Sequence, residues 1–141
     1  MTRDARIRIS GPAALAACVA VCFTGSASAA APLVKKSSGP LTATLAPSTH
    51  TPKVNAKWPI TVTATLNGKP AHASAYYEFL YGGSVVSTTY VSGNKHFTFT
   101  GHFSDRLVFP GASVGEPLTL RVVVQDDGHT VDLDWAITSH S

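Results

Sequence analysis

Apolar and polar residues alternate along most of the chain from Leu41 onward. The clearest run spans residues 58–66, where large apolar side chains occupy every second position and threonines lie between most of them. Similar alternation recurs in residues 118–125 and 131–137. Alternation with period two is typical of a strand that buries one face and exposes the other. Because no helical spacing of apolar residues accompanies it, the pattern predicts an all-β domain.

Turn residues separate the alternating runs at fairly even intervals. Two-residue loops are indicated at Gly82-Gly83, Gly93-Asn94 and Asp127-Gly128, and turn chemistry at residues 67–70 ends an earlier strand. About seven strands with short loops are the pattern of a two-sheet antiparallel sandwich. The expected strands are residues 41–45, 58–66, 72–81, 84–92, 95–103, 118–125 and 131–137.

The two loops within residues 72–103 predict how three successive strands are aligned. With two-residue loops, Phe97 and Phe99 lie opposite Tyr90 and Thr88, and the aromatic side chains gather on one face. A slip by one residue would place these aromatic side chains on both faces of the sheet. Their position on a single face therefore supports the register that the two loops predict.

A two-residue loop at residues 127–128 predicts a second register. It pairs Asp126 with His129 and Arg121 with Asp134. Opposite charges then lie side by side on the outward face, where cross-strand pairs contribute about 0.2–1 kcal/mol.

The first 29 residues have the parts of a secretory signal peptide. Three arginines precede an uncharged apolar run at positions 13–23, and small residues surround Ala29. This run is shorter than the ~20 residues that a membrane-spanning helix needs. We therefore expect cleavage after Ala29, a flexible linker over residues 30–40 and a folded domain over residues 41–141.

A second interpretation of the leader stays open. The stretch from Leu15 to Cys18 resembles a bacterial lipobox, in which Cys18 becomes the lipidated first residue. Ordinary cleavage predicts a secreted or cell-surface protein, whereas lipidation predicts a membrane-anchored lipoprotein. Contact with the membrane is expected only if Cys18 is lipidated or the leader stays uncleaved.

Removal of the leader changes what the composition implies. Of 11 Lys and Arg and 8 Asp and Glu, residues 1–29 hold three Arg and one Asp, which leaves eight basic and seven acidic residues. A net charge of +1 with scattered basic residues does not provide the clustered positive face that nucleic-acid binding requires. Both cysteines lie in the leader, so packing rather than a disulfide must stabilise the exported domain.

Four segments of the domain carry a resemblance to a known family. They are residues 50–54 (HTPKV), 58–63 (WPITVT), 67–70 (NGKP) and 115–124 (GEPLTLRVVV). Together they resemble bacterial immunoglobulin-like domains of exported proteins in high-GC Gram-positive bacteria, over about residues 41–138. The resemblance implies an immunoglobulin-like sandwich at the cell surface without catalytic residues. The Cys…Trp…Cys spacing of antibody domains is absent, so the resemblance concerns architecture alone.

Residues 111–115 (GASVG) match the G-x-S-x-G pattern of hydrolase nucleophiles. That pattern works at a strand-to-helix turn above a parallel sheet, where the backbone exposes the serine hydroxyl. Here it precedes another expected strand and no helix. We therefore interpret Ser113 as part of a corner between sheets and expect no enzyme activity.

The titratable residues do not form a convergent metal set. Six histidines are present, but no H-x-x-x-H or H-E-x-x-H pair occurs. His96 and His102 lie ~20 Å apart along an extended strand. The acidic residues between positions 126 and 134 diverge along the expected hairpin instead of surrounding a calcium ion. We expect neither a metal nor a cofactor.

An unusually apolar outward face is the strongest candidate for a binding surface. It is expected to hold Tyr76, Leu80, Val85 and Val91. Such a face either packs against another part of the fold or binds a partner. The sequence therefore favours a non-catalytic domain that contacts an extracellular protein or an envelope component. The alternative is a small carbohydrate- or ligand-binding module that uses the same face.

Overall fold

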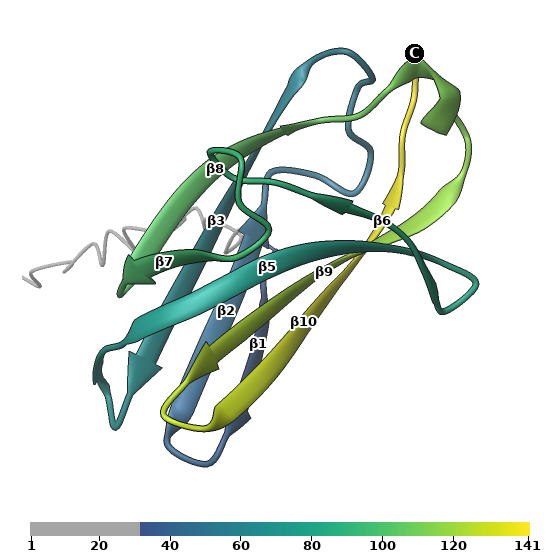
Figure 1. The fold of residues 1–141 in the computed structure, drawn as a ribbon. Coiled ribbons are helices and arrows are strands. Elements are labelled where there is room, and N and C mark those ends of the chain that lie inside the picture. The colour runs from purple at the N-terminus through teal and green to yellow at the C-terminus, as the bar shows by residue number, and fades with distance from the viewer. Residues whose placement is uncertain (1–31) are drawn as a thin grey trace, which may run out of the picture.

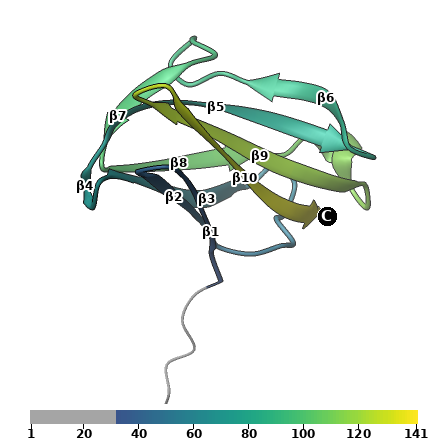
Figure 2. The ribbon, with the colours of Figure 1, turned by 90° about the horizontal axis from the view of Figure 1, so that it is seen from below.

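The computed structural model describes residues 32–141 as two antiparallel five-stranded sheets packed face to face (Figures 1 and 2). One sheet contains β1 (Val34–Ser38), β2 (Leu41–Pro47), β3 (Lys57–Leu66), β4 (Lys69–Pro70) and β8 (His102–Val108). The other contains β5 (His72–Tyr81), β6 (Ser84–Thr89), β7 (Phe97–Thr100), β9 (Pro117–Asp126) and β10 (His129–Thr138). A short 3-10 turn, η1 (Gly111–Ser113), is the one helical element of these residues. The predicted all-β two-sheet sandwich is confirmed.

The core lies between the sheets and is built from the alternating apolar positions. In β3, Trp58, Ile60 and Val62 are buried, and in β10 Leu133 and Trp135 face them from the opposite layer. Threonines between these positions in β3 are partly exposed. Burial of large apolar side chains at every second position supplies the main driving force for this arrangement.

The expected linker is in part a strand. Val34–Ser38 forms β1 and pairs with β2 from Val34↔Leu45 to Ser38↔Leu41. Val34 packs against the core, whereas Lys35 and Lys36 stay exposed. An edge strand needs few apolar residues, because its backbone hydrogen bonds to one neighbour carry the pairing. The polar composition of this segment therefore concealed the strand.

The expected strand at residues 95–103 is two strands in different sheets. β7 pairs with β5, which places Phe97 and Phe99 opposite Ala75 and Ala73, while β8 crosses over and pairs with β3. Gly101 lies between them with φ +70°, a conformation that favours glycine. The prediction that these phenylalanines lie opposite residues of β6 is wrong, because β6 and β7 pair with successive parts of β5 and not with each other.

The strand β6 follows β5 with one extra residue. The Gly82-Gly83 loop has the two residues that the sequence predicted and aligns Leu80 with Val85, but Phe79 then pairs with Ser87. Val86 is left without a partner in this bulge and is 57% exposed, instead of lying on the aromatic face. The two consecutive valines were the local sign that alternation fails here.

Aromatic side chains fill the side of the sandwich where β8, an edge strand of one sheet, lies near the edge of the other sheet formed by β6 and β7. No backbone pairing joins the two sheets there among the described residues. Phe97 of β7 and Phe103 of β8 have ring centroids 4.5 Å apart. Phe109 makes edge contacts with Trp58 at 5.4 Å and with Phe79 at 5.6 Å. These contacts between side chains close the side that the strands leave open.

Candidate functional site

The four residues expected to form one binding face do not share one exposed surface. Tyr76 is half-buried on the outward side of β5, and Leu80, on the same side of that strand, is only 5% exposed. Val85 pairs with Leu80 and is exposed, but Val91 packs against the core. The chain turns after β6 through paired backbone hydrogen bonds between Val91 and Asn94, and this turn directs Val91 inward.

The ring of Tyr76 is engaged by neighbouring side chains. The ring of His96 lies 4.7 Å from it between centroids, and Lys95 Nζ lies 4.9 Å from its centroid. A cation over an aromatic face is attracted by the ring quadrupole. Burial, with a further contribution from the nearby Glu78, raises the pKa of the Tyr76 phenol, so the hydroxyl stays protonated at neutral pH.

An ion pair organises the outward face beside Tyr76. Arg121 Nε donates to Asp134 Oδ1 at 2.7 Å, and Arg121 Nη2 donates to Asp134 Oδ2 at 3.0 Å. The hydrogen bond from Arg121 lowers the pKa of Asp134. Glu78 stands opposite Arg121 in the pairing of β5 with β9. The predicted pairing of Arg121 with Asp134 is confirmed. The outward surface beside Tyr76 therefore carries charged side chains that already contact one another.

Exposed apolar side chains gather instead at one end of the sandwich, beside the end of β5 and the loop that contains η1. Figure 2 shows this end of β5 on the right. Tyr81, Val86 and Val108 are each at least half exposed, at 50%, 57% and 57%. With Pro110 and Leu118 they surround two adjoining hollows of about 370 and 230 Å³. These five residues are called the apolar corner below. Glu116 is the only charged residue that lines either hollow.

Local structure explains how two stretches of the chain, residues 81–86 and 108–118, build the apolar corner. The bulge turns Val86 of β6 outward, and β8 ends at Val108 beside it. Pro110 leads into η1, whose Ser113 donates its hydroxyl proton to the Pro110 carbonyl at 2.7 Å. Ser139 Oγ donates to the Ser113 carbonyl at 2.6 Å and ties this loop to the end of β10. The corner is therefore held by a fixed loop.

Ser113 has a structural role in these contacts. Its side chain is 8% exposed, and its hydroxyl lies 2.9 Å from Ser139 Oγ. Its turn leads into β9 through Val114, with no helix that would expose the hydroxyl. Among the described residues no histidine is hydrogen-bonded to Ser113. The corner between strands that the sequence predicted is observed.

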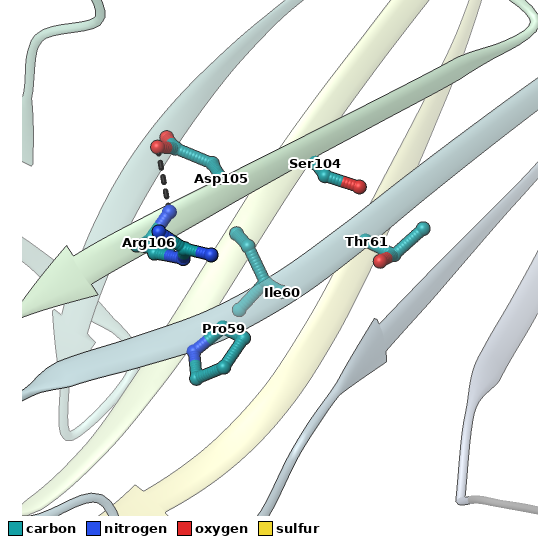
Figure 3. Close-up of a pocket in the computed structure, with 6 residues that line it drawn as sticks. All are labelled: Pro59, Ile60, Thr61, Ser104, Asp105 and Arg106. Carbon is teal, nitrogen blue, oxygen red and sulfur yellow. Dashed lines mark hydrogen bonds between the residues drawn. The ribbon is translucent and has the colours of Figure 1, made fainter.

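A hollow of about 530 Å³ lies over β3 and β8 (Figure 3). It is lined by Pro59, Ile60, Thr61, Ser104, Asp105 and Arg106. The Asp105 carboxylate accepts a hydrogen bond from the backbone N–H of Arg106 at 2.7 Å, drawn as the dashed line in Figure 3. The remaining polar groups of this hollow belong to separate strand positions and do not converge on one point.

Charged residues line another hollow between two hairpins. It measures about 570 Å³ and places Lys69 and His72 on one wall and Asp126 and Asp127 on the other. No ion pair joins these walls in the part of the chain that the structure describes. Across residues 32–141, no group of three or more His, Cys, Asp or Glu residues is arranged to hold a metal ion.

Comparisons with known protein families, with curated proteins and with solved structures found no match for this chain. Within residues 32–141, no helix is long and apolar enough to cross a membrane. The expected signal peptide over residues 1–29 and the lipidation expected as an alternative at Cys18 lie outside the described residues.

The apolar corner was not predicted from the sequence. Its members come from two stretches of the chain, residues 81–86 and residues 108–118, and only the fold brings these together. A local signal was nevertheless present, because adjacent apolar residues at Val85-Val86 and Val108-Phe109 break strict alternation. Val108 faces solvent while Phe109 is buried, whereas Val85 and Val86 are both exposed.

Proposed function

We propose that this chain is an exported, non-catalytic immunoglobulin-like module of the cell surface or extracellular space, which acts by contacting an extracellular protein or an envelope component. The apolar corner is the observation that carries the proposal. Its three most exposed members are half or more exposed and lie beside two hollows with a single charged lining residue. Apolar patches of this kind on small soluble domains are typical of interaction sites.

Export is supported by the residue pattern of the leader. Arginines, a short apolar run and small residues before Ala30 are the parts that a secretory signal requires. A non-catalytic role is supported by the contacts of Ser113, whose hydroxyl is bonded to the Pro110 carbonyl and lies beside Ser139 Oγ. The bacterial immunoglobulin-like family remains a resemblance of sequence segments and of the two-sheet architecture.

The test expresses the full chain in a high-GC Gram-positive host and fractionates cells, envelope and medium. We expect the protein outside the cytoplasm, with a mass that begins at Ala30 after cleavage or carries a diacylated Cys18 after lipidation. Purified exported protein is then added back to envelope fragments. Wild-type protein should be retained, and Val86→Asp should lower retention by about tenfold, because a desolvated carboxylate opposes apolar burial.

Val114→Asp is the matched control. Val114 is 44% exposed and lies in the same loop region, but it lines neither hollow. Equal retention of wild type and Val86→Asp would contradict a role for the apolar corner. Protein confined to the cytoplasm in uncleaved form would contradict export.

A carbohydrate-binding module is the second candidate, and the surroundings of Tyr76 favour it. A sugar that displaced Lys95 from the half-buried Tyr76 ring would find a stacking surface, with the Arg121–Asp134 pair beside it as a source of polar partners for its hydroxyl groups. Tyr76→Ala should then abolish binding to a glycan array, while the midpoint of unfolding stays close to that of the wild type. Absence of any wild-type signal on the array would eliminate this candidate.

A further inference from the structure

The two sheets of the sandwich carry opposite charges. The strands of the sheet formed by β1, β2, β3, β4 and β8 contain five basic residues and one acidic residue, Asp105. The strands of the other sheet contain one basic residue, Arg121, and four acidic residues. The net charge of +1 outside the leader conceals this separation, because the charges of the two sheets largely cancel.

The outward side of the basic sheet combines cations with hydroxyl groups, and it is called the hydroxyl face below. Lys35, Lys57 and Arg106 are exposed, and the strand register directs all three away from the core. Asp105 pairs with the buried Ile60 and therefore lies on the core side. The hydroxyl groups between the cations belong to Thr42, Thr44, Thr61, Thr63, Thr65 and Ser104.

The cations of the hydroxyl face are available to a ligand. Among the described residues the one ion pair joins Arg121 to Asp134 on the opposite sheet, so these cations have no acidic partner. Lys35 lies three strands from Arg106 and about four residues along the strand direction, which separates their Cα atoms by roughly 20 Å. Cations this far apart suit an extended ligand with several negative charges.

Hydrogen bonds already orient hydroxyl groups between these cations. Ser37 Oγ lies 2.8 Å from Thr42 Oγ1, and the hydroxyl groups of Thr44 and Thr63 are hydrogen-bonded across β2 and β3. A hydroxyl group has one donor and two acceptor sites, so each pair keeps a donor and acceptors for a ligand.

A recess in the hydroxyl face lies beside one of the cations. The hollow of about 530 Å³ over β3 and β8 forms this recess, and its outward lining residues are Pro59, Thr61, Ser104 and Arg106 (Figure 3). Its volume is within the range of small-molecule sites. One unit of an extended ligand fits here while other units contact the rest of the face.

We propose that the hydroxyl face binds an anionic polysaccharide of the cell envelope. Carboxylate groups of the polysaccharide pair with Lys35, Lys57 and Arg106, and its hydroxyl groups exchange hydrogen bonds with the threonines between them. This inference adds a second binding surface to the proposed function. It does not depend on the apolar corner, which meets the hydroxyl face at Val108.

The composition of the hydroxyl face favours this partner over nucleic acid and over lipid. Nucleic-acid binding needs clustered cations, and single strands are bound by stacking on aromatic side chains. The outward strand residues of this face include no Phe, Tyr or Trp, and its three cations are spread over roughly 20 Å. Docking on a lipid surface needs apolar side chains beside the cations, whereas threonines occupy the centre of this face.

The test measures binding of the purified exported chain to fluorescein-labelled oligogalacturonate by fluorescence anisotropy at neutral pH. A labelled maltooligosaccharide of the same length is the uncharged comparison. We expect binding to the oligogalacturonate alone, with an affinity that falls as salt is added, because exposed charges are screened. Lys35→Gln/Arg106→Gln should raise the dissociation constant about tenfold. No binding of the oligogalacturonate by the wild type overturns the inference.

Lys36→Gln/Lys69→Gln is the matched control. Lys36 and Lys69 are exposed in the same sheet, but they pair with Ala43 and Leu66, whose side chains pack on the core side. The control loses the same charge and should keep the dissociation constant within about twofold. Equal weakening by both double variants overturns the inference, because net charge alone then explains binding. Unfolding midpoints near that of the wild type will show that the variants fold.

Thr44→Val/Thr63→Val tests the hydroxyl groups. It should weaken binding to the oligogalacturonate about threefold or more, and leave binding to oligoacrylate, which carries carboxylates without hydroxyl groups, unchanged. Wild-type protein that binds oligoacrylate as tightly as oligogalacturonate overturns recognition of a polysaccharide. Tighter binding to single-stranded DNA or to phosphatidylglycerol vesicles also overturns it, in favour of that partner.

The outcomes separate this inference from the proposed function. If oligogalacturonate does not bind but envelope retention still falls in Val86→Asp, the inference is overturned and the proposed function stands. If Lys35→Gln/Arg106→Gln alone loses oligogalacturonate binding and envelope retention does not depend on Val86, the hydroxyl face stands and the role of the apolar corner is contradicted.

Discussion

At the scale of single residues, the Arg121–Asp134 pair links stability to pH. The hydrogen bond from Arg121 keeps the pKa of Asp134 in the folded protein below its usual value. A carboxyl group with a lowered folded-state pKa contributes stability that is fully present above the unfolded-state pKa of about 4. This contribution is lost as the pH falls through the lower folded-state pKa.

Asp134→Asn should therefore lower the free energy of unfolding by about 0.5–1 kcal/mol at neutral pH, a small effect because the pair is partly exposed. Urea unfolding at neutral pH and near pH ~2 measures the change, which should disappear in acid. Asp132→Asn is the control, since no hydrogen bond involving its side chain is found among the described residues. A difference that persists unchanged in acid would show that the pair does not stabilise the fold electrostatically.

The hydroxyl of Tyr77 is a second residue-scale case. Tyr77 is fully buried, and its Oη has no hydrogen-bond partner among the described residues. Burial, reinforced by the nearby Asp105, raises the pKa of this phenol far above its usual range, so it stays neutral. An unpaired buried hydroxyl costs about 1–3 kcal/mol, which phenylalanine avoids.

Tyr77→Phe should consequently leave stability unchanged or raise it by about 1 kcal/mol. Tyr77→Ala should cost about 3–5 kcal/mol, because it leaves a large cavity in the core. Thermal and urea unfolding measure both changes. A loss of more than about 2 kcal/mol in Tyr77→Phe would show that the hydroxyl is bonded in solution.

At the scale of elements, the change of sheets between β7 and β8 depends on Gly101. Its φ of +70° suits glycine, and a Cβ there would approach Pro70 Cβ to 2.9 Å. Gly83, in the loop between β5 and β6, also has a positive φ of +84°, but a Cβ there meets nothing within 4 Å. The two glycines therefore separate backbone strain from steric contact.

Gly101→Ala should lower stability by about 2–4 kcal/mol, and Gly83→Ala by about 1–2 kcal/mol. Chemical denaturation of both variants beside the wild type provides the comparison. If the two variants lost the same stability, the close approach to Pro70 would have no energetic consequence.

Element by element, the sequence predicted the interior of the sandwich better than its edges. Alternation identified β3, β9 and β10, because each buries one face along its whole length. It missed β1, which needs only Val34 on the core, and it joined β7 to β8 across a glycine. β1 pairs locally with β2 but is mostly exposed, so it has no apolar alternation to detect. The crossing from β7 to β8 depends on partners distant in the sequence, which local periodicity does not record.

The candidate site was predicted less well than the fold. Tyr76, Leu80, Val85 and Val91 were grouped because regular alternation from residue 72 to residue 92 would align them. One extra residue in β6 and a turn after Thr89 end that alignment, so Val91 reaches the core. One extra residue moves every later side chain of a strand to the opposite face of the sheet. The single bulge in β6 therefore misplaced all the residues predicted after it.

At the scale of the whole molecule, the position of the cysteines predicts how the domain responds to reduction. The only two cysteines, Cys18 and Cys22, precede β1, which is the first strand of the described residues. No disulfide can therefore join strands of the sandwich, and the core alone stabilises it. The thermal midpoint of the exported chain should be the same with and without dithiothreitol. A midpoint that fell on reduction would point to a covalent link involving the leader.

The sequence by itself determined the class of the fold, the central strands and the register of the last hairpin, including the Arg121–Asp134 pair. These features follow from period-two burial and short turns, which act between residues close in the chain. Only the tertiary structure decided the crossing at Gly101, the place of β1 and the apolar corner. The crossing pairs β7 and β8 with strands distant in the sequence, and the apolar corner joins residues 81–86 with residues 108–118. β1 pairs with its neighbour β2, but its contact with β10 depends on how the two sheets pack.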